Sequence, residues 1–233
     1  MRPRTTMAAL GTATVLLGFG LAGCGTDSGT KATSSERAVT SSTAGAPVVA
    51  PSSSAQVQGP AYTIADYARD NGITQSMVKR NAPGAPQFDL PVPVGWVDVS
   101  GGAPDVSWGV IVPKDALNDD DAPSIIARMG RLSGGKVDQA KILELAPNKV
   151  RNMPGYQGAD IGQRGTVSGF KSAQIAGTIV HQGQPVFVVR KTVVIPGRDG
   201  TYLLALDAQG APDQQDVILK AMSVIDAESR IVP

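Results

Sequence analysis

The segment from Phe170 to Asp207 constrains the fold of this chain most strongly, because it contains three successive apolar stretches joined by two turn sequences. The linkers at 181–184 and 197–200 have the composition of β-hairpin turns. In the middle stretch the two alternating faces are both largely apolar, although Arg190 and Thr192 share one of them. A strand of this kind needs cover on both sides. We therefore predict an antiparallel sheet with further elements packed on its faces.

The flanking sequence supplies those elements. Helical spacing of apolar residues and terminal signals predict three helical segments, at 62–72, at 137–153 with an interruption at Pro147, and at 212–229. The remaining patterns predict an extended segment at 87–93, strands at 96–99, 107–112 and 124–132, and an acidic loop at 118–121. The predicted fold class is α+β, an antiparallel sheet of about five to seven strands with helices packed on it.

The N-terminus predicts export and lipidation. Arg2 and Arg4 precede an apolar run that is too short to cross a bilayer comfortably. We therefore predict that residues 1–23 form a signal peptide. The run ends in Leu-Ala-Gly-Cys at 21–24, which resembles the bacterial lipobox. We expect Cys24 to carry acyl chains such as palmitate after cleavage. Two acyl chains give stable anchoring, so we expect the protein to be bound to the extracytoplasmic face of the membrane. Shedding from the membrane, or exposure at the cell surface, would place the domain outside the cell.

The segment that follows Cys24 is predicted to be a disordered tether. Residues 25–60 contain 13 Ser or Thr, six Ala, four Gly and three Pro in 36 positions, and no aromatic residue. Such a stretch cannot bury enough apolar surface to offset the entropy of ordering. We therefore expect the lipidated Cys24 and tether at 24–60 and a single globular domain at 61–233, which we expect to be monomeric.

Composition excludes several functions. One Cys and one His cannot build a zinc or iron–sulfur site, and no nucleotide fingerprint is present, so we expect neither a metal nor a cofactor. The formal net charge is +1, and no basic stripe supports nucleic-acid binding. A group of oxygen ligands at 115–121 lacks the spacing of a calcium loop and is interpreted as a solvated acidic turn.

Candidate catalytic residues are few, and we expect no enzyme. The one possible imidazole base, His181, lies in a predicted hairpin turn, and no Gly-x-Ser-x-Gly elbow accompanies it. Four Ser-x-x-Lys matches lack the other motifs of serine–lysine enzymes, and they begin at Ser28, Ser76, Ser133 and Ser168.

Aromatic residues offer candidate ligand contacts. Tyr67, Trp96, Trp108 and Tyr156 could line an apolar groove for a lipid. The alternative is that these side chains pack in the core.

Several segments resemble the mycobacterial LpqN/LpqT lipoprotein family, in matching order and spacing across the mature domain. The resemblance implies a Mog1/PsbP-like α/β/α sandwich and a place in the mycobacterial cell envelope, with links to envelope lipid biogenesis and lipid exporters. It implies no catalytic residues. The segments that carry it are Tyr62–Tyr67, Asp89–Pro93 with Trp96, Ala146-Pro147, Pro154–Gly158 and Lys191–Pro196.

Three functions remain open from the sequence. The first is a non-catalytic lipoprotein that binds an amphiphilic envelope lipid or docks on an envelope lipid-transport protein. The second is a surface-exposed module that binds a host protein. The third is a weak envelope hydrolase that uses His181.

Overall fold

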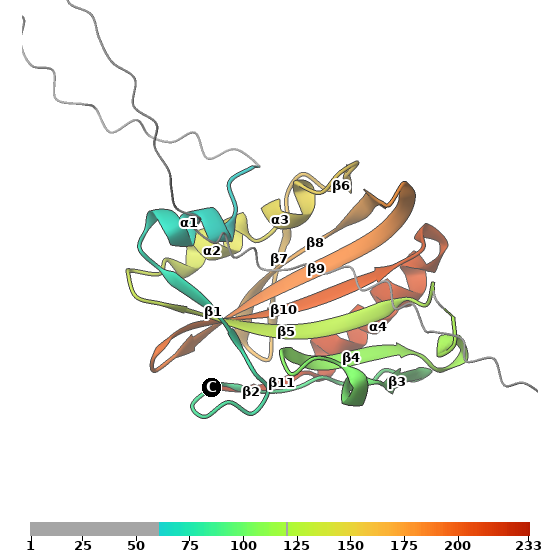
Figure 1. Ribbon diagram of the computed structural model, residues 1–233, viewed down its shortest axis with the longest axis horizontal. Helices are drawn as coiled ribbons and strands as arrows, with labels where there is room; N and C mark the ends of the chain where they lie inside the picture. Colours follow the sequence, from blue (N-terminus) through green and yellow to red (C-terminus); the bar gives the residue numbers. More distant parts are fainter. Residues whose placement is uncertain (1–60, 120) are drawn as a thin grey trace, which may run out of the picture.

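The structure is a computed structural model, and it describes residues 61–119 and 121–233 (Figure 1). The predicted signal peptide, Cys24 and the predicted tether lie outside the described residues, as does Asp120 of the acidic loop. The fold is α+β, with helices on both faces of a large antiparallel sheet, as predicted.

The sheet has nine strands. Seven follow one path in the order β3-β4-β5-β10-β9-β8-β6, while β1 pairs with β5 and β7 pairs with β8. A separate two-stranded ribbon joins β2 to β11 near the C-terminus (Figure 1). The strands are β1 (Thr74–Val78), β2 (Gln87–Asp89), β3 (Trp96–Asp98), β4 (Ser107–Pro113), β5 (Ser124–Ser133), β6 (Gln157–Gly158), β7 (Gln163–Val167), β8 (Phe170–His181), β9 (Gln184–Gly197), β10 (Gly200–Gly210) and β11 (Arg230–Val232).

The three predicted central strands are β8, β9 and β10, and both predicted hairpins are present. His181 pairs with Gln184, so Gln182 and Gly183 form the first turn, with φ values of 50° and 79°. Positive φ at both turn residues is the geometry that a two-residue hairpin favours. The second hairpin pairs Gly197 with Gly200.

The helices lie where their patterns predicted them. They are α1 (Ile64–Asp70), α2 (Gln139–Leu145), α3 (Asn148–Arg151) and α4 (Gln215–Glu228), the last preceded by a 3₁₀ turn at Pro212–Gln214. Pro147 separates α2 from α3, as expected for a residue that cannot continue a helix. Among residues 61–119 and 121–233, even the longest helix, α4 with 14 residues, lacks the length and apolar character that a bilayer crossing requires.

Two apolar layers hold the sandwich together. The layer between the sheet and α4 includes Val193, Leu204 and Ile225, and it is the larger of the two. On the opposite face, α1 and α2 pack on Leu132, Val194 and Leu203. The alternation along β9 is the one that the sequence predicted.

Several short strands were not predicted. β1 follows the helix that the sequence did predict, but it has only one buried residue in five, Val78. β7 likewise buries only Val167 at its end. Such edge strands carry little apolar alternation, so the pattern on which strand prediction relies is missing.

Candidate functional site

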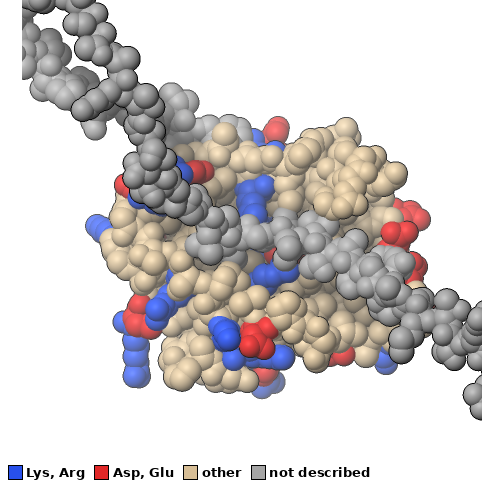
Figure 2. Space-filling view, in the orientation of Figure 1, with Lys and Arg blue, Asp and Glu red and all other residues tan. Residues whose placement is uncertain are grey.

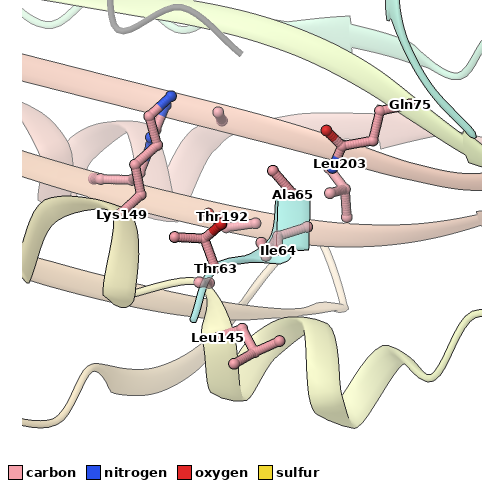
Figure 3. Close-up of a pocket in the computed structure, with 11 residues that line it drawn as sticks. Thr63, Ile64, Ala65, Gln75, Leu145, Lys149, Thr192 and Leu203 are labelled. Carbon is pink, nitrogen blue, oxygen red and sulfur yellow. The ribbon is translucent and has the colours of Figure 1, made fainter. Parts of the chain in front are cut away.

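A cleft of about 190 Å³ lies between the sheet and the helices α1, α2 and α3. It is partly open to the surface. Figure 3 shows Thr192 and Leu203 on the sheet, Lys149 on α3 and the first residues of α1 around the same space. The residues that line it are Thr63, Ile64, Ala65, Gln75, Leu145, Ala146, Lys149, Arg190, Thr192, Leu203 and Ala205.

Small side chains on the sheet and on the helices leave this space. Thr192 of β9 and Ala205 of β10 lie directly opposite each other in the register. Ala65 of α1 and Ala146 at the end of α2 also line the cleft. Because none of these side chains reaches far, the helices and the sheet do not close completely against each other.

Local sequence signals fix the helices that form the other wall. Thr63 caps α1, since its side chain accepts a hydrogen bond from the backbone N–H of Asp66 and the Asp66 carboxylate accepts one from the backbone N–H of Thr63. Pro147 ends α2 and sets the start of α3, which carries Lys149. The capped start of α1 and the break at Pro147 therefore position both ends of the wall.

One part of the cleft is basic. Of the described residues that line it, Lys149 and Arg190 are the charged ones. Arg190 lies one alternation step from Thr192 along β9, so both face the same side of the sheet. Arg128 of β5 lies on this side as well, because its partner in the register is Ala205. We call Arg128, Lys149 and Arg190 the basic cluster.

A single carboxylate, Asp207, holds both arginines of the basic cluster. Nη2 of Arg190 donates a hydrogen bond to Oδ2 of Asp207 over 2.9 Å, and Nε lies 2.7 Å from Oδ1 without the alignment of a hydrogen bond. Nη1 of Arg128 donates to the same Oδ2 over 3.2 Å. The side chains of Asp207 and Arg190 are 4% and 5% exposed, and that of Arg128 is 11% exposed. Charges this deep interact strongly.

The pKa of Lys149 reflects this environment. Burial lowers the pKa of its ammonium group from 10.5 to about 8, and the positive charge of Arg190 acts in the same direction. Asp207 opposes the shift, and Arg128 adds to it. Lys149 therefore lies in a partly desolvated position, where both neighbouring guanidinium groups lower the pKa of its ammonium group.

A second depression, of about 230 Å³, differs in character. It lies beside β2 and β4 and is lined by the charged residues Arg80, Asp89 and Asp98, with an edge of Trp108. Its walls are mainly polar, so it lacks the apolar surface of the cleft.

The predicted aromatic residues do not come together at the cleft. Tyr67, on α1, packs into the apolar layer between the helices and the sheet, where its hydroxyl accepts a hydrogen bond from the N–H of Asp138 and donates one to the carbonyl of Lys136. Trp96 and Trp108 lie in the layer beneath α4, and the indole N–H of Trp108 donates to the carbonyl of Val78. Tyr156 packs near α3 and donates to the carbonyls of Ala159 and Ala176. All four side chains thus pack into apolar clusters, and none of them lines the cleft.

His181 is the last residue of β8, beside the hairpin turn. None of the hydrogen bonds among the described residues joins it to a serine or to a carboxylate. In the same part of the chain no three His, Cys, Asp or Glu side chains gather in a way that could hold a metal ion.

The sequence alone predicts no role for the charged residues of the cleft. Arg190 is a polar position in an otherwise apolar strand, and Asp207 ends the third apolar stretch. The signal that could have found them is their position opposite each other in the hairpin register, where each interrupts an apolar face. Arg128 and Lys149 had no comparable signal, because tertiary packing alone brings them to this point.

Comparison with known proteins identifies the family of this chain. The family described as "Probable lipoprotein LpqN" matches residues 60–232. Lipoprotein LpqN of Mycobacterium tuberculosis is 39% identical over 180 residues, which cover 76% of this chain and 77% of that protein. The chain belongs to the LpqN lipoprotein family.

The solved structure of a family member agrees with this assignment. A crystal structure of M. tuberculosis LpqN, described as involved in cell envelope biogenesis, superposes with a TM-score of 0.69 and covers 75% of this chain and all of that one, at 39% identity. Cyanobacterial PsbP from Synechocystis matches with a TM-score of 0.40 and 10% identity over 68% of this chain and 92% of its own. The recognition of an LpqN-type sequence and of its α/β/α fold is therefore confirmed.

Proposed function

We propose that this LpqN-family protein holds part of an amphiphilic envelope lipid in the cleft and does so without catalysing a reaction. The observation that carries the proposal is the combination of aliphatic walls, from Ile64, Leu145 and Leu203, with two charged side chains in one part of the lining. Small-molecule sites typically have this composition, mostly apolar with a few placed polar groups. A role in cell-envelope biogenesis, the description given to the M. tuberculosis relative, fits a lipid ligand.

The size of the cleft limits what it encloses. Its volume of about 190 Å³ lies below the roughly 300–1,000 Å³ of typical small-molecule sites. A lipid therefore places only a segment in the cleft, and the rest extends outside it.

The start of the domain lies at the cleft, which supports a ligand that comes from a membrane. Thr63, Ile64 and Ala65, at the start of the described chain, line the cleft directly. We propose that Cys24 carries acyl chains and that residues 25–60 act as a tether, as the sequence indicates. A random coil of 36 residues spans roughly 30–35 Å. The tether would then join the domain at the edge of its own binding site and keep that site near the lipid surface.

The arrangement around His181 supports binding over hydrolysis. A serine hydrolase needs a hydroxyl and a carboxylate on the two nitrogens of one imidazole. His181 instead ends a strand beside a turn, and the lining of the cleft does not include it. His181→Ala should leave any weak hydrolase activity of the preparation unchanged.

The test compares two tryptophan substitutions at exposed helical alanines. Ala65→Trp places an indole at the cleft, while Ala227→Trp places one on α4, on the other side of the sheet. Lipids that co-purify with the membrane-anchored chain are quantified by mass spectrometry. The proposal predicts a bound amphiphile in the wild type and in Ala227→Trp, and its loss from Ala65→Trp.

Two outcomes would contradict the proposal. A wild-type protein that carries no lipid but crosslinks in cells to a lipid-transport protein would favour docking instead. Equal lipid content in the two tryptophan variants would show that lipid binds elsewhere on the molecule. The anchor is tested separately, since Cys24→Ser should move the protein from the membrane to the soluble fraction.

A further inference from the structure

The charge around the cleft is unbalanced. Arg128 and Arg190 contribute two positive charges and share the single carboxylate of Asp207, and Lys149 lies near enough for the charges of all three to act on its ammonium group. Within residues 61–119 and 121–233, the lining of the cleft contains no Asp or Glu. Figure 2 shows Lys and Arg atoms in the middle of the face viewed.

The geometry leaves donor capacity for another acceptor. Oδ2 of Asp207 accepts from both arginines, and Oδ1 lies against Nε of Arg190. Each guanidinium group has five N–H donors, so these contacts occupy only some of them. Arg190 is 95% buried, because its side chain is 5% exposed, and it also lines the cleft. A buried arginine held rigidly by a carboxylate is a pre-organised site for an oxyanion.

We infer that the cleft selects amphiphiles with an anionic head, a carboxylate or a phosphate, which the basic cluster binds beside the aliphatic wall. This inference rests on the proposed function, because it adds the class of head group to the lipid that the cleft holds. The alkyl segment lies against Ile64, Leu145 and Leu203, and the head contacts Lys149 and Arg190. Asp207 orients the two arginines and does not bind the ligand.

The environment of Lys149 agrees with this assignment. Burial and the two neighbouring guanidinium groups lower the pKa of its ammonium group. An anionic head placed among these cations would offset that repulsion. Ligand binding should therefore raise the pKa of Lys149 towards its ordinary value.

The test uses the full chain with Cys24→Ser, so that no acyl group of its own competes for the cleft. Isothermal titration compares four probes, namely dodecanoate, dodecyl phosphate, a neutral dodecyl polyoxyethylene ether and inorganic phosphate. We expect both anionic amphiphiles to bind at least about tenfold more tightly than the neutral ether, as a hydrogen bond between charged groups allows. Inorganic phosphate should bind much more weakly than dodecyl phosphate.

Two matched variants locate the preference. Lys149→Met and Lys220→Met each remove one positive charge, but Lys220 is exposed on α4, on the other side of the sheet. We expect Lys149→Met to reduce the preference for anionic amphiphiles about tenfold with little change for the neutral ether. Lys220→Met should keep the wild-type preference.

The outcomes separate the two proposals. Equal affinity for the anionic and neutral amphiphiles would overturn the anionic selection while leaving lipid binding intact. Equal affinity for inorganic phosphate and dodecyl phosphate would overturn it too, since the alkyl chain would then contribute nothing. An equal loss in the two methionine variants would also overturn it, since the effect would be one of net charge. Failure of every alkyl probe to bind would overturn lipid binding itself.

Discussion

Asp207 should be the most costly single charge to remove from this protein. In Asp207→Asn the side chain keeps its shape but loses the negative charge that faces Arg128 and Arg190. Both guanidinium groups then stay buried without a counter-charge, and Lys149 lies nearby. Breaking a buried pair by removing one partner costs about 3–5 kcal/mol, because the remaining charge is desolvated and unpaired. Since Asp207 is 4% exposed and serves two arginines, we expect a value in this range.

Urea unfolding measures the loss. For a domain of this size a slope of roughly 2 kcal/mol per molar urea converts the loss to a midpoint shift of about 1.5–2.5 M. Asp105→Asn is the matched control, because it breaks the ion pair with Lys79, in which the side chains are 80% and 68% exposed. An exposed pair contributes about 0–1 kcal/mol. If the two variants lost the same small amount, the claim that the basic cluster depends on Asp207 would be refuted.

A double-mutant cycle adds a second check on the same reasoning. Removal of Asp207 increases the repulsion on Lys149, so Lys149→Met should recover part of the loss. We expect the double variant to be less destabilised than the sum of the two single variants. Strict additivity would mean that Lys149 does not share the electrostatic environment of the arginines.

Further predictions concern Lys149 and the start of α1. The affinity for dodecanoate, measured by calorimetric titration, should fall as the pH rises above about 8, because Lys149 then loses its proton. Lys149→Met should flatten this pH profile. The pKa of Lys149 is about 8 in the folded chain and lies below the ordinary 10.5, so the unfolded chain binds more protons between these two values. The contribution of Lys149 to the free energy of unfolding should therefore rise from pH 8 to pH 10.5. Urea unfolding of the wild type and of Lys149→Met across this pH range measures that rise. Thr63→Ala should cost about 0.5–2 kcal/mol by removing the N-cap of α1, and an unchanged unfolding midpoint would contradict the role of the cap in fixing this wall of the cleft.

The architecture could be predicted because local patterns agree with the tertiary structure. Turn residues and two-sided apolar character define β8, β9 and β10, and Pro147 marks the break between α2 and α3. The edge strands β1 and β7 escaped prediction because each buries a single side chain. Register with a neighbouring strand, and not sequence pattern, decides such elements.

The cleft could not be predicted in the same way. Its charged part joins β5, α3, β9 and β10, and no spacing along the chain links Arg128 to Lys149 or to Asp207. The few aromatic residues are the candidate ligand contacts that the sequence suggests, yet Trp96 and Trp108 pack beneath α4. The walls of the cleft come instead from small and aliphatic residues, which are common in any core and carry no distinguishing signal.

The most direct test of lipid binding in the cleft is methyl NMR of the chain during titration with dodecyl phosphate. Ile64, Leu145 and Leu203 report on the cleft, whereas Ile218 and Ile225 report on the layer beneath α4. We predict saturable chemical-shift changes for the methyl groups of Ile64, Leu145 and Leu203, and little change for those of Ile218 and Ile225. Shifts confined to the α4 side, or none at all, would contradict the account.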